Sequence, residues 1–161
     1  MRRMFFVFAA VFATAAIAVP AAFAALTFHS GPTFSINDQG QLVCSADVSG
    51  LGNATSTPAT CSSSSATATY QCFNNGGNHP KAGNKETVTA PVTNTENVPV
   101  SNGRAKANVA TGPPGPGSFT CPGGQSLFLV SVSYTNPTFT IQGQSFTGGT
   151  VSRSNLMIPV G

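Results

Sequence analysis

The chain has 161 residues, of which 40% are hydrophobic and only 7% are charged, and its formal net charge is +3. Disorder usually needs low hydrophobicity together with high net charge, so this composition predicts a folded protein. Arg2 and Arg3 belong to a segment that we expect to be removed, and the five basic residues that remain are dispersed among four acidic ones. So small a net charge, without clustered Lys and Arg, excludes a nucleic-acid partner.

Residues 1–24 have the pattern of a cleavable signal peptide. The two arginines precede an apolar run from Phe5 to Val19, and Ala22-Phe23-Ala24 is the small-residue pattern that a signal peptidase cuts after. The apolar run is shorter than the roughly 20 residues that span a bilayer, and no second run of that length follows it. We therefore expect a secreted, extracellular protein with no transmembrane segment after cleavage.

The mature chain is long enough for one domain with its own hydrophobic core. We expect residues 25–39 to form an N-terminal leader with the first strand, and residues 40–161 to form a single β-sandwich domain. His29 lies five residues inside the new N-terminus, and we expect it in a flexible part of the leader.

Alternation of apolar and polar residues with a period of two predicts short strands along the mature chain. The clearest runs are at 42–48, 66–72, 105–109 and 128–134, with weaker strands around 34–36, 88–92, 98–100, 146–151 and 156–160. Phe139 and Ile141 follow a turn at Asn136-Pro137, which predicts a central hairpin with the run before it. No window has helical apolar spacing. The pattern predicts an all-β fold, a two-layer antiparallel β-sandwich of immunoglobulin-like architecture, with a closed barrel as the alternative.

Four cysteines are present in the mature chain, at Cys44, Cys61, Cys72 and Cys121. An even number in an exported protein predicts two disulfides, and the absence of a C-x-x-C spacing disfavours the alternative of a metal site. Four cysteines allow three pairings. A hairpin folded at residues 50–53 would bring Cys44 opposite Cys61, which favours Cys44–Cys61 together with Cys72–Cys121.

Residues 74–84 form a long polar loop that is the candidate binding site. Amide and imidazole groups supply directional hydrogen bonds to a neutral polar ligand such as a glycan. The candidate binding residues are Asn74, Asn75, Asn78, His79 and Lys81. The alternative is an ordered surface loop whose Asn side chains cap their own backbone.

Catalytic groups are scarce in this sequence. Glu86 and Glu96 flank an expected strand and turn, so they could lie close together as an acid–base pair; the alternative is that both are solvated surface charges. No G-x-S-x-G motif accompanies the many serines. We assign no catalytic residue, no metal ligand and no cofactor, and we expect a non-enzymatic protein.

Several stretches together resemble a family of small, uncharacterised secreted proteins, chiefly actinobacterial. They cover roughly residues 40 to 135 and include Gly50-Leu51-Gly52-Asn53, Ala66-Thr67-Ala68-Thr69-Tyr70-Gln71-Cys72, Asn75-Gly76-Gly77-Asn78-His79-Pro80, Asn102-Gly103-Arg104, Gly112-Pro113-Pro114, Ser118-Phe119-Thr120-Cys121-Pro122-Gly123-Gly124-Gln125 and Ser131-Val132-Ser133-Tyr134. The resemblance implies secretion, a β-rich fold and pairing of Cys72 with Cys121. It conveys no catalytic or binding residue.

A surface rich in Thr and Asn but poor in charge suits neutral polar ligands. We expect an extracellular binding or surface-structural module, with cell-wall or environmental polysaccharide or a surface protein as candidate partners. The alternatives are a small secreted hydrolase or hydrolase inhibitor, and a protein that self-assembles through edge strands.

Overall fold

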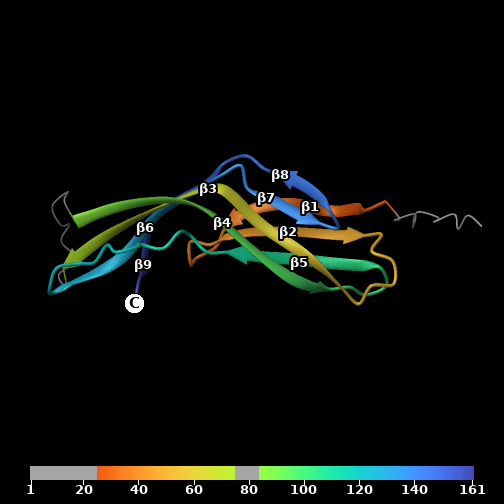
Figure 1. Ribbon diagram of the computed structural model, residues 1–161, viewed down its shortest axis with the longest axis horizontal. Coiled ribbons are helices and arrows are strands. Elements are labelled where there is room, and N and C mark those ends of the chain that lie inside the picture. Colours follow the sequence, from red (N-terminus) through yellow and green to blue (C-terminus); the bar gives the residue numbers. More distant parts are fainter. Residues whose placement is uncertain (1–24, 75–83) are drawn as a thin grey trace, which may run out of the picture.

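A computed structural model describes residues 25–74 and 84–161 of the chain (Figure 1). The expected signal peptide and most of the expected binding loop lie outside the described residues. Within those residues the protein is an antiparallel all-β fold, which confirms the predicted fold class. Residues 25–74 and 84–161 contain no helix that is long and apolar enough to cross a membrane.

The described residues form nine strands. These are β1 (Thr27–Ile36), β2 (Leu42–Ser49), β3 (Ser56–Asn74), β4 (Lys85–Pro99), β5 (Arg104–Thr111), β6 (Gln125–Thr135), β7 (Thr138–Ile141), β8 (Gln144–Thr147) and β9 (Val151–Pro159). The weak strands expected at 88–92 and 98–100 are one continuous strand. The strand expected at 146–151 is wrong, since residues 148–150 separate β8 from β9.

The strands belong to two sheets. A three-stranded sheet has the order β1-β2-β5, and a six-stranded sheet has the order β8-β7-β3-β6-β9 with β4 paired to the other edge of β3. Figure 1 shows β3 crossing obliquely over β2 and β5, with β6 and β9 extending beyond the smaller sheet. A division into three and six strands differs from the four and three of an immunoglobulin constant domain, so the immunoglobulin-like detail is not supported.

The 19-residue β3 is the central strand of the larger sheet. One of its edges pairs with β4, and the other pairs first with β7 and then with β6. The hairpin predicted at Asn136-Pro137 is therefore wrong: β6 and β7 follow one another along the same edge of β3 instead of pairing with each other. Pro137 is buried at the break between them, where its carbonyl accepts a hydrogen bond from the Gly148 amide.

The main core lies between the two sheets, where the buried alternate residues of β2 and β5 meet those of β3. Cys44 of β2 and Cys61 of β3 form a disulfide there. The sequence favours this pairing, but the hairpin at residues 50–53 that was expected to bring Cys44 opposite Cys61 is wrong. Since β2 pairs with β1 and β5 and not with β3, the disulfide joins two sheets across the core.

A Pro- and Gly-rich segment, residues 112–124, runs along the part of β3 that extends beyond the smaller sheet. The Tyr70 hydroxyl donates to the Pro114 carbonyl at 2.6 Å, and Cys72 forms the second disulfide with Cys121. Tyr70 is buried, as expected for a core aromatic. Two disulfides are compatible with an oxidising, extracellular environment.

The N-terminal residues are part of the sandwich and not a separate leader. β1 pairs with β2 from Thr27 to Ile36, and the His29 Nε2 lies 2.9 Å from the Ser49 Oγ. The expectation of a flexible setting for His29 is therefore wrong. His29 lies within β1, at a register shift between Phe28 and Ser30, and the first strand is longer than the short apolar run at 34–36 indicated.

Candidate functional site

The outer face of the six-stranded sheet is covered with hydroxyl side chains. The registers of the strands place them in four rows, each crossing four strands: Thr87, Thr69, Ser131 and Ser154; Thr89, Thr67, Ser133 and Ser152; Thr93, Ser62, Thr138 and Thr147; and Thr95, Thr60, Thr140 and Ser145. We call these rows the hydroxyl face. The alternate residues between them point to the opposite side, where most of those on β3 are buried.

The hydroxyl face arises from a simple sequence pattern. Thr-x-Thr, Ser-x-Ser or a mixture of the two occurs on every strand of this sheet, and a period of two puts both hydroxyls on one face. Thr is also favoured in strands because its β-branched side chain packs well on a pleated surface. A bulge in β3 between Ser63 and Ala66 inserts one extra residue relative to β4, and this keeps the hydroxyls outward on both sides of it.

Most threonines on this face form hydrogen bonds through their hydroxyl groups with a hydroxyl of the neighbouring strand. The Thr67 and Thr89 hydroxyl oxygens lie 3.0 Å apart, those of Thr60 and Thr95 2.8 Å apart, and the Thr140 hydroxyl lies 2.8 Å from that of Ser145. These pairs join β3 to β4 and β7 to β8. Cross-strand hydroxyl pairs of this kind stabilise the sheet but leave less hydrogen-bonding capacity for a ligand.

Four serines on β6 and β9 differ from these threonines. Ser131, Ser133, Ser152 and Ser154, here the serine quartet, make no side-chain hydrogen bond to any other described residue. The registers pair Ser131 with Ser154 and Ser133 with Ser152. Serine lacks the γ-methyl group of threonine, and a depression of about 220 Å³ lies over the quartet, with Thr67 at its border. The quartet offers about twelve acceptor and donor positions to an external partner, at two acceptors and one donor a hydroxyl.

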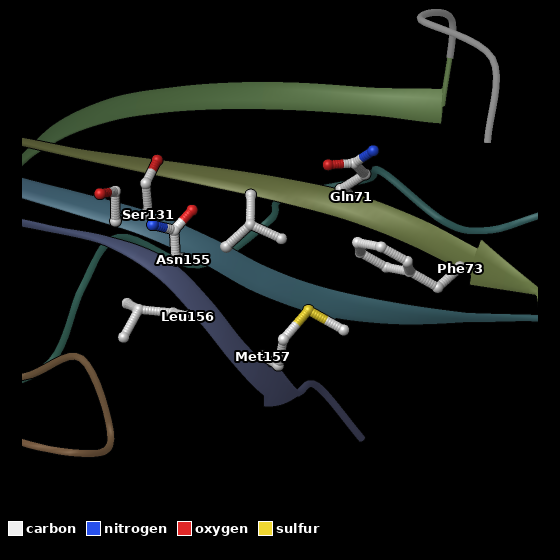
Figure 2. A pocket seen from close by; sticks show the side chains of 8 residues that line it. Gln71, Phe73, Ser131, Asn155, Leu156 and Met157 are labelled. Atoms are coloured by element: carbon white, nitrogen blue, oxygen red, sulfur yellow. The ribbon is translucent and has the colours of Figure 1, made fainter. Parts of the chain in front are cut away.

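A second and larger hollow adjoins the quartet where the regular pairing of β6 and β9 breaks. It has a volume of about 430 Å³ and shares Ser131 and Ser154 with the quartet; its other lining residues are Gln71, Phe73, Val130, Asn155, Leu156 and Met157. Figure 2 shows Gln71 and Phe73 on β3, with Asn155 and Met157 on β9 across from them. We call this the bulge hollow.

Two irregularities open the bulge hollow. Val130 is an extra residue of β6 relative to β3, and the pairing of β6 with β9 passes from Leu129–Ile158 to Ser131–Ser154, which leaves residues 155–157 opposite Val130 alone. Asn155 has a positive φ of 58°, a conformation that Asn adopts more readily than most residues. Met157 is 55% exposed as a result. Bulges of this kind often occur beside functional sites, where they redirect side chains.

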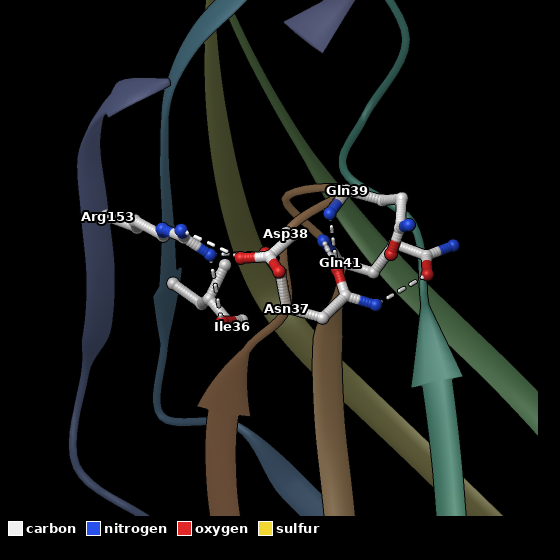
Figure 3. A network of polar contacts seen from close by, with 6 residues as sticks. All are labelled: Ile36, Asn37, Asp38, Gln39, Gln41 and Arg153. Carbon is white, nitrogen blue, oxygen red and sulfur yellow. Dashed lines mark hydrogen bonds and ion pairs between the residues drawn. The ribbon is translucent and has the colours of Figure 1, made fainter. Parts of the chain in front are cut away.

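The described residues that line the depression and the bulge hollow place no ionised group on the outer surface, and Lys85 lies outside this lining as the register partner of Gln71. Arg153 lies between two serines of the quartet in sequence, but its guanidinium is turned to the inner side. There it donates to the Asn37 carbonyl at 2.8 Å and to the Asp38 carboxylate at 2.9 Å, as Figure 3 shows. The Asn37 side chain closes the same turn by accepting from the Gln41 amide at 2.9 Å. Arg153 therefore ties β9 to the β1–β2 turn and leaves the quartet neutral.

Charge is concentrated on the opposite side of the sandwich. On the outer face of the three-stranded sheet, Arg104 donates two hydrogen bonds of 2.7 Å to the Asp47 carboxylate, and Lys106 is paired with Asp47 in register. The hydrogen bond from Arg104 holds the pKa of Asp47 below its ordinary value. This face thus carries an ion pair and a lysine, whereas the four hydroxyl rows of the other sheet contain only Thr and Ser.

One of the five expected binding residues, Asn74, lies within the described part of the chain. Asn74 is exposed at the end of β3, opposite Gln125, and it follows directly after Phe73 of the bulge hollow. Asn75, Asn78, His79 and Lys81 lie outside the described residues. The expectation that Glu86 and Glu96 could lie close together is wrong, because both are on β4, where ten residues at roughly 3.3 Å a residue separate them by up to about 33 Å.

No group of three or more His, Cys, Asp or Glu residues that could hold a metal ion occurs in the part of the chain that the structure describes. Sequence reasoning missed the serine quartet, although its signal was present in Ser131-Val132-Ser133 and Ser152-Arg153-Ser154. The apolar positions of these strands predict the core, whereas the alignment of their polar positions depends on the register between strands.

The fold and the site define an all-β module with two disulfides and an uncharged, hydroxyl-covered face. Comparisons of the chain with protein-family models, with curated proteins and with solved structures gave no match. Function is therefore inferred from the residues of this chain alone.

Proposed function

We propose that this protein is a secreted, non-enzymatic binding module that holds a neutral, hydroxyl-rich polymer, such as a cell-wall or environmental polysaccharide, on the serine quartet of its hydroxyl face. The serine quartet is the observation that carries the proposal. It presents four hydroxyls that lack side-chain partners among the described residues, in a shallow depression beside a larger hollow. Polysaccharides are recognised by many directional hydrogen bonds of this type.

The distribution of charge supports a neutral ligand. A polyanion would need Lys or Arg on the binding face and a polycation would need Asp or Glu, but the rows of the hydroxyl face contain only Thr and Ser. A shallow, elongated surface also suits an extended polymer better than a small molecule, which is usually enclosed.

The proposed location rests on the sequence. The N-terminal pattern of a signal peptide, the two disulfides and the resemblance to secreted proteins all favour export. Separation of Glu86 from Glu96 along β4 weighs against the alternative of a hydrolase that uses this pair of carboxylates, since such pairs work at separations of roughly 5 to 10 Å.

A depletion assay tests the proposal. The mature protein is mixed with suspensions of cellulose, chitin and starch, and the protein left in solution is measured. We expect binding to at least one of these polymers. Ser152 is exposed on the edge strand β9, so S152Y fills the depression without disturbing the core, and we expect it to weaken binding about tenfold, which corresponds to about 1.4 kcal/mol.

The matched control is S145Y. Ser145 is also an exposed serine on an edge strand of the same face, but it lies on β8, in the half of the sheet away from the quartet. We expect S145Y to bind as the natural protein does, although the loss of the hydroxyl pair with Thr140 should lower its unfolding temperature slightly. Absence of binding to all three polymers, or equal binding by S152Y and the natural protein, would overturn the proposal.

A further inference from the structure

The bulge hollow has a different chemistry from the hydroxyl rows beside it. Its lining combines two side-chain amides, Gln71 and Asn155, with the apolar side chains of Phe73, Val130 and Met157. Neither amide makes a side-chain hydrogen bond to another described residue. Figure 2 shows the Gln71 amide on β3 and the Asn155 amide on the side of β9, with the side chains of Met157 and Phe73 further along these strands. A ligand that only presents hydroxyls would leave the apolar wall unused.

We propose that the bulge hollow is a subsite for the acetamido group of an N-acetylated amino sugar. This inference rests on the proposed function, because the polymer on the serine quartet would deliver the group. An acetamido group has one N–H donor, one carbonyl acceptor and one methyl group. A side-chain amide can both donate and accept, so Gln71 and Asn155 can satisfy the polar atoms while the methyl group packs on Val130 and Met157.

The position of the hollow fits this role. It shares Ser131 and Ser154 with the serine quartet, so a sugar ring lying over the quartet reaches the hollow with a substituent of its own ring. The volume of about 430 Å³ leaves room for such a substituent together with part of the ring. Substituents can therefore enter the hollow without the polymer leaving the hydroxyl face.

The absence of ionisable groups among these lining residues selects between related sugars. A free amino sugar carries an ammonium group, which needs a carboxylate partner, and a uronic acid carries a carboxylate, which needs a cation. None of the residues that line the hollow is acidic or basic. The acetylated amine is neutral and therefore fits where the other two do not.

The test compares two soluble ligands that share one backbone, the β-1,4-linked hexamers of N-acetylglucosamine and of glucose. Titration calorimetry with the mature protein should give an affinity at least about tenfold higher for the N-acetylated hexamer, as expected for an added hydrogen-bonded group with a buried methyl. N155G keeps the positive-φ backbone, since Gly adopts it without penalty, and removes the amide. We expect N155G to reduce this preference to less than about threefold.

The control variant is N136G. Asn136 has a positive φ of 46° and is exposed, but it lies at the break between β6 and β7, away from the hollow. N136G should keep the full preference. Equal affinity of the natural protein for both hexamers, or an unchanged preference in N155G, overturns the acetamido subsite and leaves the proposed function standing. Binding of neither hexamer, together with no depletion by any of the three polymers, overturns both.

Discussion

The buried hydroxyl of Tyr134 makes the stability of the fold depend on pH in the alkaline range. Tyr134 is 0% exposed, and its hydroxyl donates to the Gly40 carbonyl at 2.7 Å. Burial raises the pKa of Tyr134 to about 12, whereas an unfolded tyrosine titrates near 10. Because the folded state holds its proton more tightly, this contribution is fully present below pH 10 and is lost as the pH rises through 12. Two pKa units at about 1.4 kcal/mol each give a loss of about 2.7 kcal/mol.

Denaturant unfolding followed by circular dichroism at pH 8 to 12 measures this loss, with Y134F as the reference. At pH 8, Y134F should be less stable by about 1 to 2 kcal/mol, because the Gly40 carbonyl loses its donor. The variant cannot ionise at this position, so the gap between the two proteins should close between about pH 10.5 and 11.5 and change sign by pH 12. Burial also raises the pKa of Tyr70, but Tyr70 is present in both proteins and its effect cancels in the difference. A gap that stays constant from pH 8 to 12 would refute the reasoning.

Two further predictions concern the disulfides and the surface ion pair. Replacing Cys72 and Cys121 by Ala should lower the free energy of unfolding by about 4 kcal/mol, and replacing Cys44 and Cys61 by Ala should lower it by about 3 kcal/mol. The first disulfide costs more to lose because it closes a loop of 49 residues and the second closes one of 17. Denaturant midpoints that rank the two variants the other way would contradict this. Arg104 lowers the pKa of Asp47, so the stabilisation is present above the unfolded pKa of about 3.9 and is lost as the pH falls below it. Thermal unfolding should therefore show D47N slightly less stable than the natural protein at pH 7 and equal to it near pH 2, and a gap that widens on acidification would argue against the ion pair.

Local patterns predicted much of the fold because each strand shows one face to the core. The alternation at Leu42, Cys44, Ala46 and Val48 matches the buried face of β2. One strand is less evident from the sequence. In β3 the run Ser62-Ser63-Ser64-Ser65 has no apolar alternation, and the bulge there shifts the buried positions from odd to even numbers. A period-two pattern cannot cross such a shift, so only the second half of β3 was predicted.

Long-range pairing accounts for the remaining errors. The turn at Asn136-Pro137 looks like a hairpin when only its two flanking strands are considered. The length of β3 decides otherwise, since β3 is long enough to pair with both β6 and β7 on one edge. The bulge hollow also depends on long-range pairing between strands. It exists because β6 and β9 pair out of step between Leu129 and Ser131, and no local signal in either strand specifies that register.

The most direct test of the central claim is to map the ligand on the protein. Backbone amide shifts of the mature protein are recorded by NMR during titration with the hexamer of N-acetylglucosamine. The account predicts that the largest changes fall at residues 131–133 and 152–157, on the serine quartet and the bulge hollow, with residues 145–147 of β8 unaffected. Changes confined to the charged outer face of β2 and β5, at residues 43–49 and 104–110, would contradict it.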